Sequence, residues 1–130
     1  MRTRSSAPVY VTLIADNPET VDALHAYLGG AGVASHSTRA LRDASMVPPA
    51  TTAVVMFPDE FGVEDVVASI VSLRSARPRV LILFVTGAPQ RFGSALGPDG
   101  RSVPPMVLPK PAFGWTILDA IRARASAGSP

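Results

Sequence analysis

Three nearly continuous apolar runs of strand length constrain the fold of this chain more than any other feature. Their sequences are VYVTLI at residues 9–14, TAVVMF at 52–57 and VLILFV at 80–85. Uninterrupted runs rich in β-branched residues are typical of strands buried on both faces, as in a parallel sheet that helices cover on each side. The runs therefore predict an α/β fold with a parallel sheet at its centre.

Helical patterns separate the apolar runs. After the first run, Asn17 is suited to cap a helix, Pro18 to occupy its first position, and Gly29 with Gly30 to end it. Apolar residues at helical spacing predict a further helix over 63–76 and a closing helix over 113–125. The residues expected to pack from these two helices are Val66, Val67, Ile70, Leu73, Trp115, Ile117, Leu118 and Ile121.

Weaker patterns occupy the rest of the chain. Residues 32–36 favour a short second strand and residues 38–44 a short helix before the Pro48-Pro49 break. A brief helical segment at 91–96 is followed by a Gly/Pro-rich stretch, which predicts a loop, and then by a last short strand at 106–108. The region of the fourth helix is therefore expected to be shortened or remodelled.

Composition and charge narrow the function. A chain of 130 residues suits one domain, which we expect at 9–125 between an N-terminal extension, 1–8, and a flexible tail or linker, 126–130. There is no cysteine, which excludes disulfides and thiolate chemistry. The arginines are scattered and no apolar run is long enough for a membrane span or signal peptide. We therefore expect a cytoplasmic domain that binds neither nucleic acid nor membrane.

Sequence patterns typical of several enzyme classes are missing. The turn after the first strand, ADNPET, contains no glycine, unlike dinucleotide-binding folds, and no GxxxxGK[ST] or GxSxG motif occurs. His25 and His36 lack a companion carboxylate at metal-ligand spacing.

Five strands that alternate with helices predict a doubly wound parallel sheet, which binds ligands at the carboxyl ends of its strands. The residues that lie at these ends are Ala15, Asp16, Phe57, Thr86 and Lys110.

At these positions the sequence resembles the receiver domain of response regulators, the CheY-like family. That family has paired acids after the first strand, an aspartate ending the third, Thr or Ser ending the fourth, and Lys-Pro after the fifth. The matching segments are LIADNPET at 13–20, AVVMF at 53–57, LFVTG at 83–87 and LPKP at 108–111. The resemblance extends from about Val9 to Ala125 and implies a flavodoxin-like five-stranded sheet of order 2-1-3-4-5, with helices on both faces.

The resemblance also implies a degenerate phosphorylation pocket. In the family, the acids hold Mg²⁺, the aspartate accepts a phosphoryl group, and Lys and Thr contact the phosphoryl oxygens. Here Ala15 replaces the first acid, which leaves Asp16 as a weak candidate metal ligand, and Phe57 stands in place of the acceptor. Val107 occupies the switch position, where the family carries an aromatic residue. Phosphorylation at position 57 is therefore not expected.

Two features of this pocket allow alternatives. Asp59 lies two residues beyond Phe57 and is an alternative acceptor. Lys110 is the only lysine beside eleven arginines, and we expect it to form a structural salt bridge with Asp16 while Phe57 plugs the pocket. The bond between Lys110 and Pro111 is a candidate cis peptide.

These departures predict a pseudo-receiver of bacterial two-component phosphorelay signalling, which is not an enzyme, needs no cofactor and binds proteins without phosphorylation. The expected partner is a kinase, an output domain or a regulator, with a homodimer as a further candidate. The face implied for partner contact comprises Gln90, Arg91, Phe92, Met106, Phe113, Trp115 and Arg122. The competing hypotheses are a divergent phospho-accepting receiver that uses Asp59, and a sensor in which Thr86 and Lys110 hold a small anionic ligand.

Overall fold

The computed structural model describes residues 9–41, 48, 51–77, 79–92, 106–110 and 112–127, without the side chains of 124–127. Strands and helices alternate along these residues. The elements are β1 (Tyr10–Ile14), α1 (Pro18–Gly30), β2 (Ala34–Thr38), β3 (Ala53–Met56), the 3-10 turn η2 (Pro58–Glu60), α2 (Val63–Ala76), β4 (Leu81–Thr86), the 3-10 turn η3 (Pro89–Phe92), β5 (Met106–Pro109) and α4 (Gly114–Ala127).

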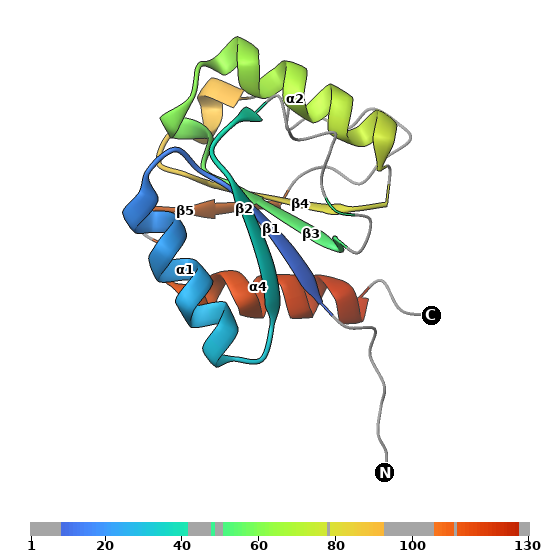
Figure 1. The fold of residues 1–130 in the computed structure, drawn as a ribbon. Coiled ribbons are helices and arrows are strands. Elements are labelled where there is room, and N and C mark those ends of the chain that lie inside the picture. The colour runs from blue at the N-terminus through green and yellow to red at the C-terminus, as the bar shows by residue number, and fades with distance from the viewer. Residues whose placement is uncertain are drawn as a thin grey trace.

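The strands form one sheet in the order β2-β1-β3-β4-β5, and every neighbouring pair is parallel (Figure 1). The predicted fold class and strand order are confirmed. Ile14 pairs with Thr38 on one side and Met56 on the other, and Met56 pairs with Phe84. Because the strands are parallel and aligned, their carboxyl ends meet along one border, which we call the carboxyl edge.

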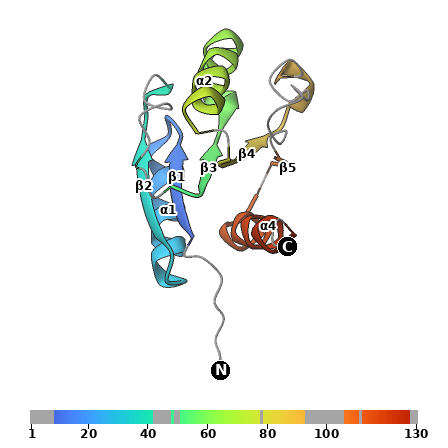
Figure 2. The same cartoon turned by 90° about the vertical axis from the view of Figure 1, so that its right-hand side faces the viewer.

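Helices cover both faces of the sheet. Figure 1 shows α1 and α4 on one face and α2 on the other, and Figure 2 shows the same layers from the side. Side chains alternate between the two faces along a strand, so Leu13 lies in the core against α1 and α4, whereas Ile14 lies in the core beneath α2 and η3. Both faces therefore need apolar side chains, which explains the uninterrupted runs.

Asn17 and Pro18 mark the start of α1 as predicted, and the helix ends at Gly30, one of the two predicted stop residues. Asn17 caps the helix, because its side chain accepts a hydrogen bond from the backbone of Glu19 at 2.9 Å, and Pro18 occupies the first turn. At the other end, Gly32 has a φ of +80°, a left-handed conformation that favours glycine. The chain can therefore leave the helix and turn directly into β2.

The predicted second unit is wrong in its boundaries. The second strand was predicted at 32–36, but β2 begins at Ala34 and continues to Thr38, so Thr38 does not start a helix. The bounds of β2 follow from its pairing with β1, because each of the five residues of β2 pairs with one residue of β1. Most of the predicted helix at 38–44 lies outside the described residues.

The last third of the chain also differs from prediction at its boundaries. Around the predicted helix at 91–96, the structure has η3 ending at Phe92, and residues 93–105 lie outside the described residues. Helix α4 reaches Ala127, so 126–127 are helical rather than tail. The extension at 1–8 and residues 128–130 are also outside the described residues. No helix within the described ranges is long and apolar enough to cross a membrane.

Candidate functional site

Phe57 directly follows the third strand, which ends one residue earlier than predicted, and its side chain belongs to the core. The backbone N–H of Phe57 donates to the carbonyl of Ile14 at 3.0 Å, which continues the pairing of β1 and β3 one residue past Met56. The ring is 6% exposed and lies in the core cluster with Ala15, on the face covered by α1 and α4. An apolar ring at this position offers neither a nucleophilic oxygen nor a metal ligand.

Asp59 is the side chain that meets the predicted pocket residues. The turn η2 carries it against β4, where the hydroxyl of Thr86 donates to Asp59 Oδ1 and the backbone N–H of Gly87 donates to Oδ2 at 2.8 Å. Lys110 Nζ lies 3.5 Å from the same Oδ2. We call Thr86 Oγ1, Gly87 N and Lys110 Nζ the anion cradle. Both oxygens of Asp59 are therefore occupied by interactions within the chain.

The anion cradle stabilises the charged form of Asp59. Burial raises the pKa of this carboxyl, but the hydrogen bonds from Thr86 and Gly87 and the charge of Lys110 lower it by more, so the pKa of Asp59 lies below its ordinary value of 3.8. At neutral pH the cradle therefore holds a carboxylate anion.

Glu60, the next residue, contacts the segment after β1 instead of the loops after β4 and β5. Its Oε1 accepts hydrogen bonds from the backbone N–H groups of Asp16 at 2.6 Å and Asn17 at 2.7 Å, directly before α1. A carboxylate is favourable there because the first turn of a helix leaves N–H groups without partners in the helix. The two acids of η2 thus connect the loop after β1 with the loops after β4 and β5.

The predicted salt bridge between Asp16 and Lys110 is wrong. Asp16 contacts Arg39 instead, through its backbone carbonyl at 3.0 Å and its carboxylate at 3.4 Å. The strand order explains why Asp16 pairs with Arg39 and not with Lys110. Asp16 follows β1 and Arg39 follows the neighbouring strand β2, whereas Lys110 follows β5 at the far border of the sheet. Asp59 lies between them in the sheet order and pairs with the lysine.

The donor set for a metal is incomplete in the described part of the chain. No group of three or more His, Asp or Glu side chains lies close enough to hold a metal ion among those residues. His25 forms a hydrogen bond with Ser35 of β2 instead. At the switch position, Val107 is half-buried and pairs with Phe84. The geometry of the Lys110-Pro111 bond falls outside the described residues, because Pro111 is not among them.

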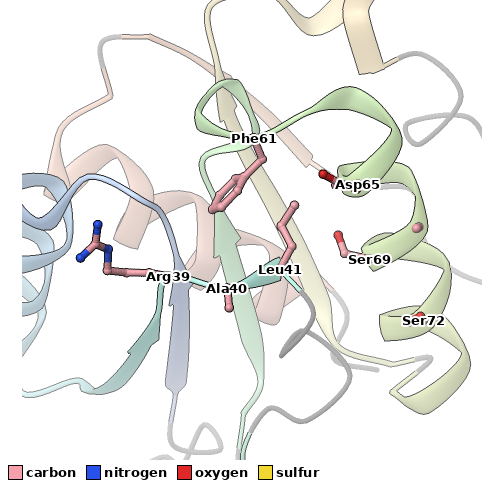
Figure 3. Close-up of a pocket in the computed structure, with 8 residues that line it drawn as sticks. Arg39, Ala40, Leu41, Phe61, Asp65, Ser69 and Ser72 are labelled. Carbon is pink, nitrogen blue, oxygen red and sulfur yellow. The ribbon is translucent and has the colours of Figure 1, made fainter.

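A depression of about 460 Å³ lies beside the carboxyl edge, between the segment after β2 and helix α2 (Figure 3). Figure 3 shows the apolar side chains of Leu41 and Phe61 on one side, with Asp65 and Ser69 of α2 opposite. The hydroxyl of Ser69 already donates to the carbonyl of Val66 at 2.8 Å. The remaining lining residues are Arg39, Ala40, Ala68 and Ser72. The donors that converge on a single anion are those of the anion cradle, not of this depression.

Two aromatic residues of the predicted partner face differ in exposure. Phe92 is 0% exposed and packs edge-on against Phe84, with ring centroids 6.0 Å apart, so it is not available to a partner. Trp115, for which both core packing and partner contact are predicted, is 54% exposed and stacks on Phe113 with ring centroids 4.5 Å apart. The buried residues of α4 form one side of the helix, and Trp115, three residues before Leu118, lies at the border of that side. Those buried residues are Ile117, Leu118 and Ile121.

The other residues of the predicted face are accessible to different degrees. Gln90, Arg91 and Arg122 are exposed, and Met106 is half-buried on the border strand β5. Arg91 lies over the ring of Phe92, 5.3 Å from its centroid. The accessible part of the face therefore consists of Gln90, the two arginines and the stacked aromatic pair.

Comparison with known proteins identifies the fold. No family model and no curated protein matches the chain. Among solved structures, a response regulator receiver protein from Sinorhizobium medicae WSM419 matches with a TM-score of 0.75 at 20% identity, covering 95% of this chain and 98% of that one. The fold is that of a receiver domain. This receiver fold is preserved although four fifths of the aligned residues differ.

Two further solved structures support the same fold. A CheY-like response regulator receiver domain protein from Methanospirillum hungatei JF-1 has a TM-score of 0.70 at 14% identity, covering 93% of this chain and 96% of that chain. The signal receiver domain of an HD domain-containing protein from Pseudomonas fluorescens Pf-5 has a TM-score of 0.71 at 16% identity. The match covers 93% of this chain and 97% of that chain. At such identities the likeness is one of receiver fold, and the chemistry depends on this chain's own residues.

Proposed function

We propose that this chain is a pseudo-receiver: a bacterial, cytoplasmic signalling domain of two-component type that binds a protein partner without being phosphorylated. In this proposal it is not an enzyme and needs no cofactor. The observation that carries the proposal is the occupation of the anion cradle by Asp59, while Phe57, in the place of the acceptor, is buried in the core.

The contacts of Asp59 argue against its use as an alternative acceptor. To attack a phosphoryl donor, one carboxylate oxygen would have to leave its partners in the cradle. The group transferred would then need the same Thr86, Gly87 and Lys110 that now hold Asp59. The acid that could assist with a metal, Asp16, is paired with Arg39.

The test is intact-mass analysis after incubation with acetyl phosphate or phosphoramidate and Mg²⁺. We expect no phosphoryl adduct on the wild-type chain, and a phosphorylatable receiver treated in parallel verifies the reagents. An adduct on the wild type that disappears in Asp59→Ala would show that Asp59 is an acceptor and would overturn the proposal.

The proposed partner is a kinase, an output domain or a regulator that docks on the accessible part of the predicted face. Tryptophan and arginine side chains contribute strongly to binding energy at protein interfaces. Trp115 and Phe113 present about half of their surfaces to solvent as a stacked pair, and Arg122 lies two turns along the same helix. This surface therefore combines an apolar centre with two charged groups, Arg122 and the exposed Asp119, which lies four residues after Trp115.

A further inference from the structure

The depression beside α2 has an apolar wall on the side of the sheet. Leu41 is 9% exposed and Phe61 is half-buried, and both pack in the core beneath α2. Figure 3 shows their side chains turned into the depression, and Ala68 of α2 lines it as well. Its volume of about 460 Å³ lies within the range of roughly 300–1,000 Å³ that small-molecule sites occupy.

The opposite wall carries oxygen atoms. The carboxylate of Asp65 and the hydroxyl of Ser69 are directed from α2 toward the apolar wall (Figure 3). Because the hydroxyl of Ser69 donates its hydrogen to the carbonyl of Val66 at 2.8 Å, its oxygen is left to accept from a ligand. Within the described residues, the carboxylate of Asp65 takes part in no hydrogen bond or ion pair. This wall therefore offers a negative charge and an acceptor.

Arg39 also lines the depression, but its guanidinium group is engaged elsewhere. The group donates to the backbone carbonyl of Asp16 at 3.0 Å and lies 3.4 Å from the carboxylate of the same residue. Figure 3 shows the guanidinium directed away from Asp65 and Ser69. The charge that complements the depression is therefore positive.

We propose that the depression binds a small organic cation, whose ammonium or guanidinium group meets Asp65 and Ser69 while its apolar part packs against Leu41 and Phe61. A cation with one apolar end matches both walls, whereas an anion would face the carboxylate. None of the three donors of the anion cradle lines the depression. The site therefore goes beyond the proposed function and does not depend on it.

Asp65 also has a structural role, which it shares with its neighbour Glu64. Acids in the first turn of a helix are stabilising, and both residues lie in the first turn of α2. Of the two, Asp65 lines the depression. Glu64→Gln removes the same charge from the same turn, so it is the matched control for Asp65→Asn.

The test is an NMR titration of the full chain with 2-phenylethylammonium at constant ionic strength, followed at the backbone amides of Ala68 and Ser69. We expect saturable shifts in the wild type. The affinity should fall about three- to fivefold for 2-phenylethanol, which has the same ring without the charge, and by a similar factor for the cation in Asp65→Asn. Glu64→Gln should bind the cation as the wild type does.

Three outcomes would each overturn the proposal: no saturable shift in the wild type, equal affinity for the cation and the alcohol, or equal losses in Asp65→Asn and Glu64→Gln. Asp65→Ser removes the same carboxylate with a smaller side chain, so a folding defect in one variant does not obscure the result. A phosphoryl adduct in the mass test would contradict the proposed function and leave this site standing, because the two tests concern different residues.

Discussion

At the scale of single residues, two ion pairs lie at the carboxyl edge. The only lysine of the chain contacts Asp59, and Asp16 contacts Arg39. The pair at Asp59 is the less exposed of the two, with the aspartate side chain 20% exposed against 57% for Asp16. Interactions between exposed charges contribute little because water screens them. We therefore expect Asp59 to contribute more to stability than Asp16.

Replacing Asp59 by asparagine should make stability less dependent on pH in acid. The pKa of Asp59 in the folded chain lies below its ordinary value, so its ionised form stabilises the fold above that ordinary value, and the contribution is lost as the pH falls through the lowered pKa. We expect Asp59→Asn to reduce the free energy of unfolding by about 1–2 kcal/mol near neutral pH.

Urea unfolding at neutral pH and at about pH 3 measures this difference, with Asp22→Asn on α1 as an exposed control. The gap between wild type and Asp59→Asn should shrink at the acid pH. A gap of equal size at both pH values would show that the charge of Asp59 is not responsible.

At the scale of elements, the short turn η2 connects loops that belong to different strands. Its Asp59 joins the loops after β4 and β5, and its Glu60 joins the segment between β1 and α1. Backbone N–H groups before a helix are unsatisfied unless a side chain or water accepts from them. Glu60 meets this need from a distant part of the chain.

Glu60→Ala should therefore loosen the start of α1. We expect amide hydrogen exchange at Asp16 and Asn17 to accelerate by about tenfold, since each of these N–H groups loses its acceptor. Exchange across β4 should stay unchanged. The matched control is Glu64→Ala, which removes an exposed acid in the first turn of α2. Equal acceleration in both variants would contradict a specific role for Glu60.

At the scale of the whole molecule, the sheet is a layer between α1 with α4 and α2 (Figure 2). The helices α1 and α4 pack on the same face and contact each other, and their approach is close at Gly114. A Cβ atom at position 114 would lie 2.7 Å from the Cγ and Cδ2 atoms of Tyr27 and 3.1 Å from its Cβ. These atoms lie near the backbone of α1, so rotation of the tyrosine end cannot relieve the overlap.

Gly114→Ala should destabilise the fold, although alanine is usually the better helix residue. We expect a loss of about 1–3 kcal/mol in the free energy of unfolding, because α1 and α4 would have to separate. Gly29→Ala is the control, because no atom lies within 4 Å of the added Cβ there, and it should be neutral or stabilising.

Chemical denaturation of the single variants and of Gly114→Ala/Tyr27→Ala measures this effect. If the overlap is the cause, the second substitution recovers part of the loss at position 114. Equal stability of Gly114→Ala and Gly29→Ala would refute the close approach.

Much of the architecture could be predicted from local patterns. The apolar runs predicted β1, β3 and β4 to within one residue, and the α/β class with its strand order is confirmed. Thr86 and Lys110 also lie at the carboxyl edge as predicted, because parallel strands place their carboxyl ends together. These features depend on periodicity and chain direction, which are properties of the sequence itself.

The partners of these residues were decided by the tertiary structure. Asp16 and Asp59 were both available to Lys110 in the sequence, and the path of η2 over β4 selected Asp59. Tertiary packing also decided which residues of the predicted partner face are exposed. The packing of η3 buries Phe92, whereas the orientation of α4 leaves Trp115 in solvent. Local patterns determine where strands and helices form, whereas contacts between distant side chains depend on how the connecting segments cross the sheet.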